Sequence, residues 1–139
     1  MNRFLEKDTP IEGVKEIRRT RLTDSRGFFE RAFCSQEMSK LGWEKPIAQI
    51  NNSYTSKKGT VRGMHYQVPP YAEMKLISCL KGVVWDVVVD LRKNSATFLK
   101  WYGVEISAEN CVALLVPRGC AHGFQTLSND VELLYCHSE

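Results

Sequence analysis

The chain has 139 residues and 43% hydrophobic composition, enough to bury a core as one domain over residues 1–139. Its 19 Lys and Arg against 16 Asp and Glu include no basic block, so no nucleic-acid groove is indicated, whereas a small anionic ligand is compatible. No apolar run is long enough to cross a membrane, and MNRFLEKDTP lacks the apolar core of a signal peptide. We therefore expect a cytoplasmic protein without a membrane partner.

The strand and turn signals recur along the whole chain and predict an all-β class, a sandwich or an antiparallel barrel. One helix is expected, with Ser35 as its N-cap, 36–41 as its body and Gly42 as its end. Short apolar and β-branched segments between turn residues give the expected strands, which cover 14–22, 46–54, 59–67, 75–80, 83–92, 100–107, 111–117, 123–128 and 131–136.

The five cysteines are an odd number without a C-x-x-C spacing. This usage predicts free, buried thiols in a reducing compartment rather than a disulfide framework or a zinc site. They are Cys34, Cys79, Cys111, Cys120 and Cys136.

Residues 83–92 alternate strictly and define two strand faces. The odd-numbered positions carry three valines, a tryptophan and a leucine, and this face is expected to be the core. The even-numbered positions mix valine with Asp86, Asp90 and Arg92, as expected of a pocket wall or of a solvated surface.

His65 lies in VRGMHYQVPP, and a lone histidine on a strand is usually a structural residue. His122 lies in PRGCAHGFQ, whose P-x-G-x-x-H spacing resembles the second motif of the barrel proteins called cupins. The first cupin motif, G-x5-H-x-H, is matched by Gly59 and His65, but Gln67 occupies the place of its second histidine.

The loss of that histidine bears on metal binding. Cupin metal sites need about three imidazoles and one carboxylate around the ion. Gln67 is a weak ligand and Arg62 would repel a cation, so a metal-free pocket is predicted, in which a neutral imidazole can act as a general base. A metal-dependent cupin using His65, Glu73 and His122 is kept as an alternative.

Several longer stretches together resemble the dTDP-4-dehydrorhamnose 3,5-epimerase family, over roughly residues 11–139. They are RGFF, QINNSYTSKKGTVRGMHYQVPP, EMKLISCLKGVVWDVVVDLRKNSATFLKW, ISAEN, VPRGCAHGFQTLS and LLY. The resemblance implies a cupin jelly-roll barrel, a homodimer, and a nucleoside-diphosphate 4-keto-6-deoxyhexose as substrate. It implies no metal and no redox cofactor.

The chemistry of that family inverts carbons beside the C4 ketone. Loss of the C3 or C5 proton gives an enolate, so inversion needs a base on one face of the ring, an acid on the other and a stabiliser for the C4 oxygen. By resemblance, His65 is the base, Tyr135 is the acid and Lys75 lies near the C4 oxygen.

The resemblance also assigns binding residues. Arg62 meets the diphosphate, and Arg26 meets a phosphate from the partner subunit. Asp86 is a candidate to orient the imidazole of His65, and Gly63 a candidate for a β-bulge that brings Arg62 and His65 together. The remaining substrate-binding positions are Gln49, Asn51, His122 and Phe29.

Two departures from the family pattern shape the expected reaction. Arg31 occupies the place of a glutamate that helps to hold thymine, so both CDP and dTDP sugars are kept open. The sequence ends just past Tyr135, whereas longer members continue, and an opener pocket is expected to release product after one inversion. C3 is favoured because it lies nearer the diphosphate anchor at Arg62, with C5 possible. The expected role is in deoxysugar and O-antigen synthesis; the alternative is a catalytically weak nucleotide-sugar-binding cupin.

Overall fold

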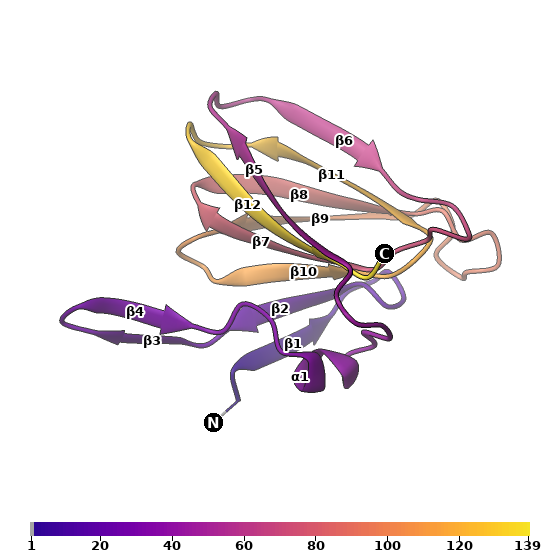
Figure 1. Cartoon of the computed structure of the whole chain (residues 1–139). Coiled ribbons are helices and arrows are strands. Elements are labelled where there is room, and N and C mark those ends of the chain that lie inside the picture. The colour runs from indigo at the N-terminus through magenta and orange to yellow at the C-terminus, as the bar shows by residue number, and fades with distance from the viewer. Residues whose placement is uncertain (1) are drawn as a thin grey trace.

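The computed structural model describes residues 2–139, which form twelve strands and one short helix (Figure 1). The elements are β1 (Phe4–Asp8), β2 (Lys15–Arg19), β3 (Arg21–Asp24), β4 (Gly27–Glu30), α1 (Ser35–Ser39), β5 (Gln49–Thr55), β6 (Val61–His65), β7 (Lys75–Lys81), β8 (Val83–Asp90), β9 (Trp101–Ser107), β10 (Val112–Val116), β11 (Cys120–Thr126) and β12 (Val131–His137).

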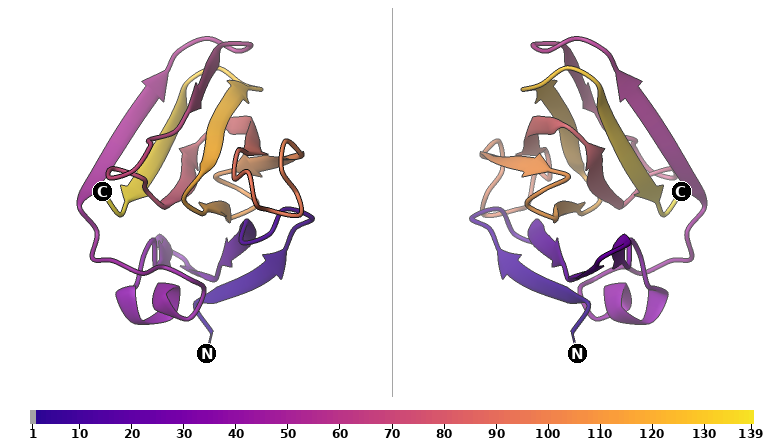
Figure 2. Two further views of the ribbon diagram at one scale, coloured as in Figure 1. Left: turned by 90° about the vertical axis from the view of Figure 1, so that its right-hand side faces the viewer. Right: turned by 90° about the vertical axis from the view of Figure 1, so that its left-hand side faces the viewer.

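Every strand pairing is antiparallel, in three sheets. A six-stranded sheet runs β1-β2-β10-β7-β12-β5, a four-stranded sheet runs β6-β11-β8-β9, and β3 pairs only with β4. The two larger sheets face each other around a common interior (Figure 2). The β3–β4 hairpin, called the arm below, projects away from that body (Figure 1).

Two apolar clusters hold these layers together. One fills the interior between the sheets and includes Ile77, Val84, Leu114 and Leu133. The other lies beneath the six-stranded sheet, where Met38 of α1 packs against its outer side. Strand β7 is therefore covered on both faces, which explains its nearly unbroken apolar sequence KLISCL.

The expected helix is present but begins differently. Cys34 rather than Ser35 occupies the N-cap position, and it makes no side-chain cap hydrogen bond. The helix ends at Ser39 with Lys40 as its C-cap, two residues before the expected end, and Gly42 beyond it has a φ of +106°. Strand β1 and the two arm strands were not separately predicted, because FLEKD is a charged edge strand and the arm has no core face.

The prediction of free thiols is confirmed, since all five cysteines are unpaired and four of them are buried, with Cys34 partly exposed. Burial raises the pKa of Cys79 and of Cys120 to about 11, so neither is a reactive thiolate at neutral pH.

The predicted inward face of residues 83–92 is wrong. Val84, Asp86, Val88 and Asp90 are the buried residues of β8, whereas Trp85 on the other face is 39% exposed. The charges are tolerated inside because each carboxylate has a partner, His122 for Asp86 and Arg92 for Asp90. Alternation defines two faces of a strand but not which one turns inward.

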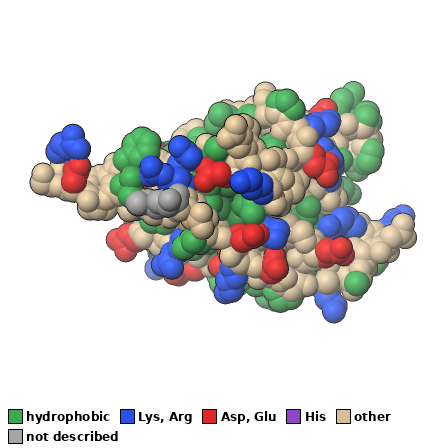
Figure 3. All heavy atoms as spheres, turned by 90° about the horizontal axis from the view of Figure 1, so that it is seen from below, with side chains coloured by type: hydrophobic (Ala, Val, Ile, Leu, Met, Phe, Trp, Pro, Cys, Tyr) green, Lys and Arg blue, Asp and Glu red, His purple; other side chains and the backbone are tan. Residues whose placement is uncertain are grey.

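No helix among residues 2–139 is long and apolar enough to cross a membrane. Viewed from below, positive and negative side chains are interspersed over the surface, without a broad patch of one sign (Figure 3).

Asp90 generates a prediction about stability. It is fully buried, accepts hydrogen bonds from Arg92, Ser95 and Thr97, and so ties the 91–100 loop to the end of β8. Burial alone would raise the pKa of this carboxyl, but those donors outweigh it and hold the pKa well below its usual range. Asp90→Asn should lower the free energy of unfolding at pH 7 by about 2–4 kcal/mol in urea denaturation.

The same pKa shift makes the stability of the fold depend on pH. A depressed native pKa stabilises the fold above the unfolded value of about 4, and the contribution is lost on further acidification. Below about pH 4 wild-type stability should therefore fall more steeply than that of Asp90→Asn. Asp8→Asn, at a carboxyl that is 85% exposed, is the control and should change stability by less than about 1 kcal/mol; equal losses in both variants would contradict the assignment.

Candidate active site

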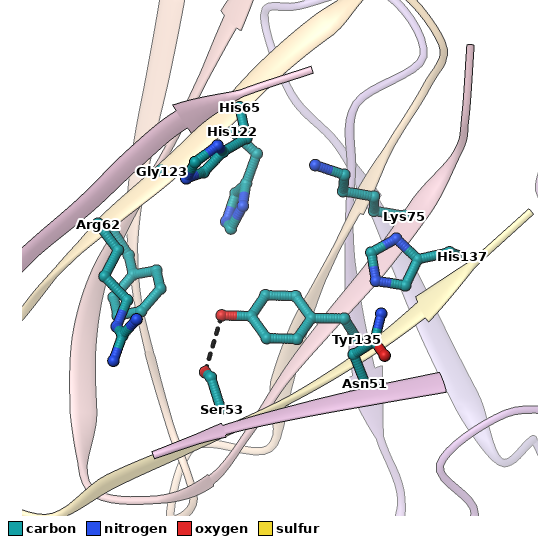
Figure 4. A pocket seen from close by; sticks show the side chains of 10 residues that line it. Asn51, Ser53, Arg62, His65, Lys75, His122, Gly123, Tyr135 and His137 are labelled. Atoms are coloured by element: carbon teal, nitrogen blue, oxygen red, sulfur yellow. Dashed lines mark hydrogen bonds between the residues drawn. The ribbon is translucent and has the colours of Figure 1, made fainter. Parts of the chain in front are cut away.

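One pocket lies between the two large sheets and collects residues from five strands (Figure 4). The six-stranded sheet supplies one wall through β5, β7 and β12, and the four-stranded sheet supplies the opposite wall through β6 and β11. Its lining residues are Asn51, Ser53, Arg62, His65, Lys75, His122, Gly123, Phe124, Tyr135 and His137. Six predicted site residues are among them.

The β6–β11 pairing places His65 directly opposite His122, and Arg62 opposite Phe124. The register shifts between those two pairs, as expected of a bulge. Gly63 there has a φ of +123°, and a Cβ on it would lie 2.6 Å from the Cα of Gly123. The irregularity expected at Gly63 is thus present, and it brings Arg62 and His65 to the same pocket.

Asp86 supports a different histidine from the one expected. Its Oδ1 lies 2.6 Å from Nε2 of His122, and both side chains are buried. Within residues 2–139 the side chain of His65 has no hydrogen-bond partner in the structure, so Asp86 does not orient it. The reason is the strand order: β11 lies between β8 and β6, so Asp86 meets the nearer histidine.

Tyr135 extends from β12 into the pocket, with its hydroxyl 2.9 Å from Oγ of Ser53 (Figure 4). Its ring stacks on His137 at 6.0 Å between centroids and meets the edge of His122 at 6.4 Å. Burial, with a smaller contribution from Asp86, raises the pKa of this phenol, although Ser53 and Arg62 act in the opposite direction. The hydroxyl therefore stays protonated at neutral pH, as an acid must.

Glu73 holds two pocket residues at once. Its Oε1 lies 3.4 Å from Nζ of Lys75, and its Oε2 lies 3.1 Å from Nδ1 of His137. All three side chains are largely buried, so the carboxylate compensates the ammonium that faces the pocket. Lys75 lies at the start of β7 and shares its strand face with Ile77 and Cys79, which are buried between the sheets.

Arg62 is oriented by strand β5. Its Nε donates to Oγ1 of Thr55 at 3.0 Å and one of its terminal nitrogens to the carbonyl of Tyr54 at 3.2 Å. Asn51 lines the pocket, but Gln49 does not; its amide donates to the main-chain oxygen of Glu139. Among residues 2–139 no carboxylate pairs with Arg62, so its guanidinium suits an anionic ligand.

Arg26 and Phe29 lie apart from this pocket, on the arm. Arg26 pairs with Asp24 at 2.6 Å, and Phe29 is 64% exposed. Within one chain the structure thus does not join these two predicted residues to the others. Nearby, Glu30 is bound by Arg19 and Arg21, while Arg31 pairs with Glu37 of α1.

The described residues show no arrangement of side chains that matches the metal-dependent alternative. Among residues 2–139, no group of three or more His, Cys, Asp or Glu side chains is placed to hold an ion. Glu73 is engaged by Lys75 and His137, and does not converge with His65 and His122.

The sequence reasoning missed Ser53 and His137. Ser53 is two positions from Asn51 on β5 and so shares its strand face, a period that was available from the sequence. His137 is likewise two positions from Tyr135 on β12. The signal was therefore present, but a serine or a histidine near a strand end carries little information alone.

A family model described as dTDP-4-dehydrorhamnose 3,5-epimerase matches residues 8–139. This chain belongs to that family. The match agrees with the antiparallel fold, and the structural relatives confirm the predicted cupin class.

Among curated relatives, the dTDP-4-dehydrorhamnose 3,5-epimerase of Shigella flexneri is 48% identical over 113 residues, covering 81% of this chain and 62% of the relative. The chain thus spans about three fifths of that relative's length.

Two solved structures, of enzymes with different named activities, are similar to this chain over most of its length. The Bacillus anthracis 3,5-epimerase, with TDP and pyrophosphate bound, has a TM-score of 0.93 and 39% identity, covering 98% of this chain and 78% of that one. A 3'-monoepimerase from Streptomyces bikiniensis, in complex with dTDP-quinovose, has a TM-score of 0.87 and 32% identity, covering 94% of this chain and 66% of that one.

The close approach of β6 to β11 at Gly63 predicts that a substitution there disturbs the pocket. Gly63→Ala should push β6 away from β11 and shift Arg62 relative to His65. It should lower the affinity of the pocket for an anionic probe such as dTDP and lower the free energy of unfolding by about 2 kcal/mol or more. Titration calorimetry with dTDP and thermal unfolding measure the two effects.

Gly42→Ala is the matched control, because Gly42 also has a positive φ of +106° but no atom within 4 Å of its added Cβ. It should cost only the strain of that φ, about 1 kcal/mol, and leave nucleotide binding unchanged. Unaltered binding by Gly63→Ala would show that the close approach does not position the site.

Proposed function

We propose that this protein is an epimerase of a dTDP-linked 4-keto-6-deoxyhexose. One observation carries the proposal: a histidine and a tyrosine come from opposite walls of the same pocket. His65 belongs to the four-stranded sheet and Tyr135 to the six-stranded sheet, so a sugar ring between them meets one proton carrier on each face (Figure 4). Inversion of a carbon requires this opposition.

One residue is assigned to each step of the proposed reaction. The imidazole of His65 removes the proton from the carbon beside the ketone. The ammonium of Lys75 faces the pocket and stabilises the charge that develops on the C4 oxygen. Tyr135, protonated at neutral pH, returns a proton to the other face, while Arg62 binds the diphosphate.

The thymidine nucleotide and carbon 3 are supported by the relatives. Those solved with nucleotides carry TDP or a dTDP sugar. Carbon 3 is inverted by both kinds of relative, since it is named in the 3,5-epimerases and in the 3'-monoepimerase. We therefore propose inversion at C3, with C5 as the carbon at which members differ.

The test uses dTDP-4-keto-6-deoxyglucose in deuterated water, with NMR to follow label at C3 and C5. We expect label and inversion at C3, and no exchange at either carbon without enzyme. CDP-4-keto-6-deoxyglucose serves as the second substrate and should react more slowly. Binding of the dTDP sugar without any exchange would indicate a nucleotide-sugar-binding protein instead of an enzyme.

His65→Ala and Tyr135→Phe should each lower turnover by about 10²–10⁴-fold, because each removes a general acid or base. Neither side chain is assigned to the nucleotide, so calorimetric affinity for dTDP should change less than threefold. The two variants should also differ from each other: His65→Ala blocks deuterium exchange, whereas Tyr135→Phe leaves the abstraction step in place. Near-normal turnover of His65→Ala would exclude its role as the base.

We also propose a homodimer in which the arm completes the partner's pocket. The arm extends from the body (Figure 1) and carries Arg26 and two exposed phenylalanines, Phe28 and Phe29, with the guanidinium of Arg21 over the ring of Phe28. Such a projecting, partly apolar element with a cation suits a nucleotide in a neighbouring subunit.

Subunit mixing tests this exchange. Arg26→Ala and His65→Ala homodimers should each be weakly active, but a mixed dimer contains one pocket with both residues intact. Random mixing of equal amounts should restore about a quarter of the wild-type sites if the dimer has twofold symmetry. No recovery in a mixture shown by mass spectrometry to contain heterodimers would mean that Arg26 serves its own chain.

A further inference from the structure

The proposed inversion leaves the protein in a different state from the one in which it began. After one turnover His65 holds a proton taken from the sugar, and Tyr135 has lost the proton that it gave. The next molecule of the same substrate needs a protonated phenol again. The pocket must therefore provide a route by which Tyr135 regains a proton, and this inference rests on the proposed function.

The surroundings of the Tyr135 hydroxyl leave one candidate for that route. Within residues 2–139 its single hydrogen-bond partner is Oγ of Ser53, at 2.9 Å, and either oxygen is able to donate (Figure 4). Ser53 is half-buried, and Asn51, Asn52 and Tyr54 around it on the same strand are exposed. Because β5 is the outermost strand of its sheet, Ser53 lies between the partly buried Tyr135 and the solvent at that edge.

Three other polar side chains that line the pocket near Tyr135 each have a partner on at least one polar atom. Nε2 of His122 is bound to Asp86, and Nδ1 of His137 is bound to Glu73. Lys75 is paired with the same Glu73. His137 also stacks on the ring of Tyr135, so its edge does not point at the hydroxyl.

Arg62, the remaining cation, cannot return the proton. It is held by Thr55 and by the carbonyl of Tyr54, and a guanidinium does not give up a proton at neutral pH. A serine hydroxyl, in contrast, both donates and accepts, as a relay must.

We propose that Ser53 is a proton relay that restores Tyr135 between turnovers. The phenolate oxygen takes the hydroxyl proton of Ser53 as the Ser53 oxygen takes a proton from a solvent water. The water is left as hydroxide, which the proton leaving His65 to solvent neutralises. The Tyr135 oxygen gains one O–H bond, the Ser53 oxygen loses one and gains one, and the water loses one, so no other reactant is needed.

The relay has a kinetic signature that orientation of Tyr135 would not produce. If only the return of the proton is slowed, the first turnover of each site stays fast and later ones become slow. Ser53→Ala should therefore form about one product per site in a burst at the wild-type rate, followed by a steady state at least about tenfold slower. Rapid quench with dTDP-4-keto-6-deoxyglucose measures both phases.

Two further variants serve as a rescue and a control for this result. Ser53→Thr keeps a hydroxyl on a strand residue and should restore the steady-state rate. Ser56→Ala, at an exposed serine just beyond β5, should behave as wild type throughout. The solvent deuterium isotope effect should increase in the slow phase of Ser53→Ala and be unchanged in its burst.

Three outcomes overturn the relay. A steady-state rate of Ser53→Ala within twofold of wild type means that Tyr135 regains its proton elsewhere. A fall in the burst rate itself, with linear product formation afterwards, means that Ser53 only orients Tyr135. Wild-type protein that binds the dTDP sugar but neither exchanges nor inverts it refutes the proposed function, and the relay with it.

Discussion

The backbone of β6 lies so close to that of β11 that neither Gly63 nor Gly123 can carry a side chain without moving a strand. An added Cβ on Gly123 would meet the carbonyl oxygen of Arg62 at 2.9 Å, and one on Gly63 would meet the Cα of Gly123 at 2.6 Å. The positive φ of Gly63 then changes the strand register, so that Arg62 and His65 reach one cavity. An arginine and a histidine three positions apart would otherwise face opposite ways.

The second organising feature is the pairing of buried charges. An unpaired ion in a protein interior is costly, and here carboxylates pair with one cation and two imidazoles of the pocket. Asp86 fixes His122, and Glu73 fixes Lys75 together with His137. His65 remains outside these pairs, on the opposite wall from Tyr135. The residues proposed to move protons are thus less constrained by ion pairs than the residues that frame them.

The arm and the pocket are held in place by different contacts. The pocket is built from strands whose inner faces are buried, so its geometry is held by the core between the sheets. The two arm strands pair with each other, and the arm's base is held by the ion pairs of Glu30 with Arg19 and Arg21 and by a hydrogen bond from Arg21 to the carbonyl of Ala108. A projecting hairpin leaves its strand edges and side chains available to another chain, which agrees with the proposed role of Arg26 and Phe29 in a second subunit.

The sequence alone determined the all-β class, most strand positions and the helix near residues 35–41, because period-two alternation and turn residues are local properties. Motif spacing and family resemblance also selected His65, Lys75, His122 and Tyr135, which the fold then brought into one pocket. Local pattern could not decide which face of residues 83–92 turns inward, since both faces carry valine and only the neighbouring sheet distinguishes them.

Only the tertiary structure decided the partners. Asp86 meets His122 and not His65 because β11 separates the two strands concerned. Ser53 and Tyr135 are 82 residues apart in the chain, and their hydroxyls meet only because β5 pairs with β12 in one register. Such contacts depend on strand order and register, which are fixed by packing over the whole barrel and leave no mark in a short stretch of sequence.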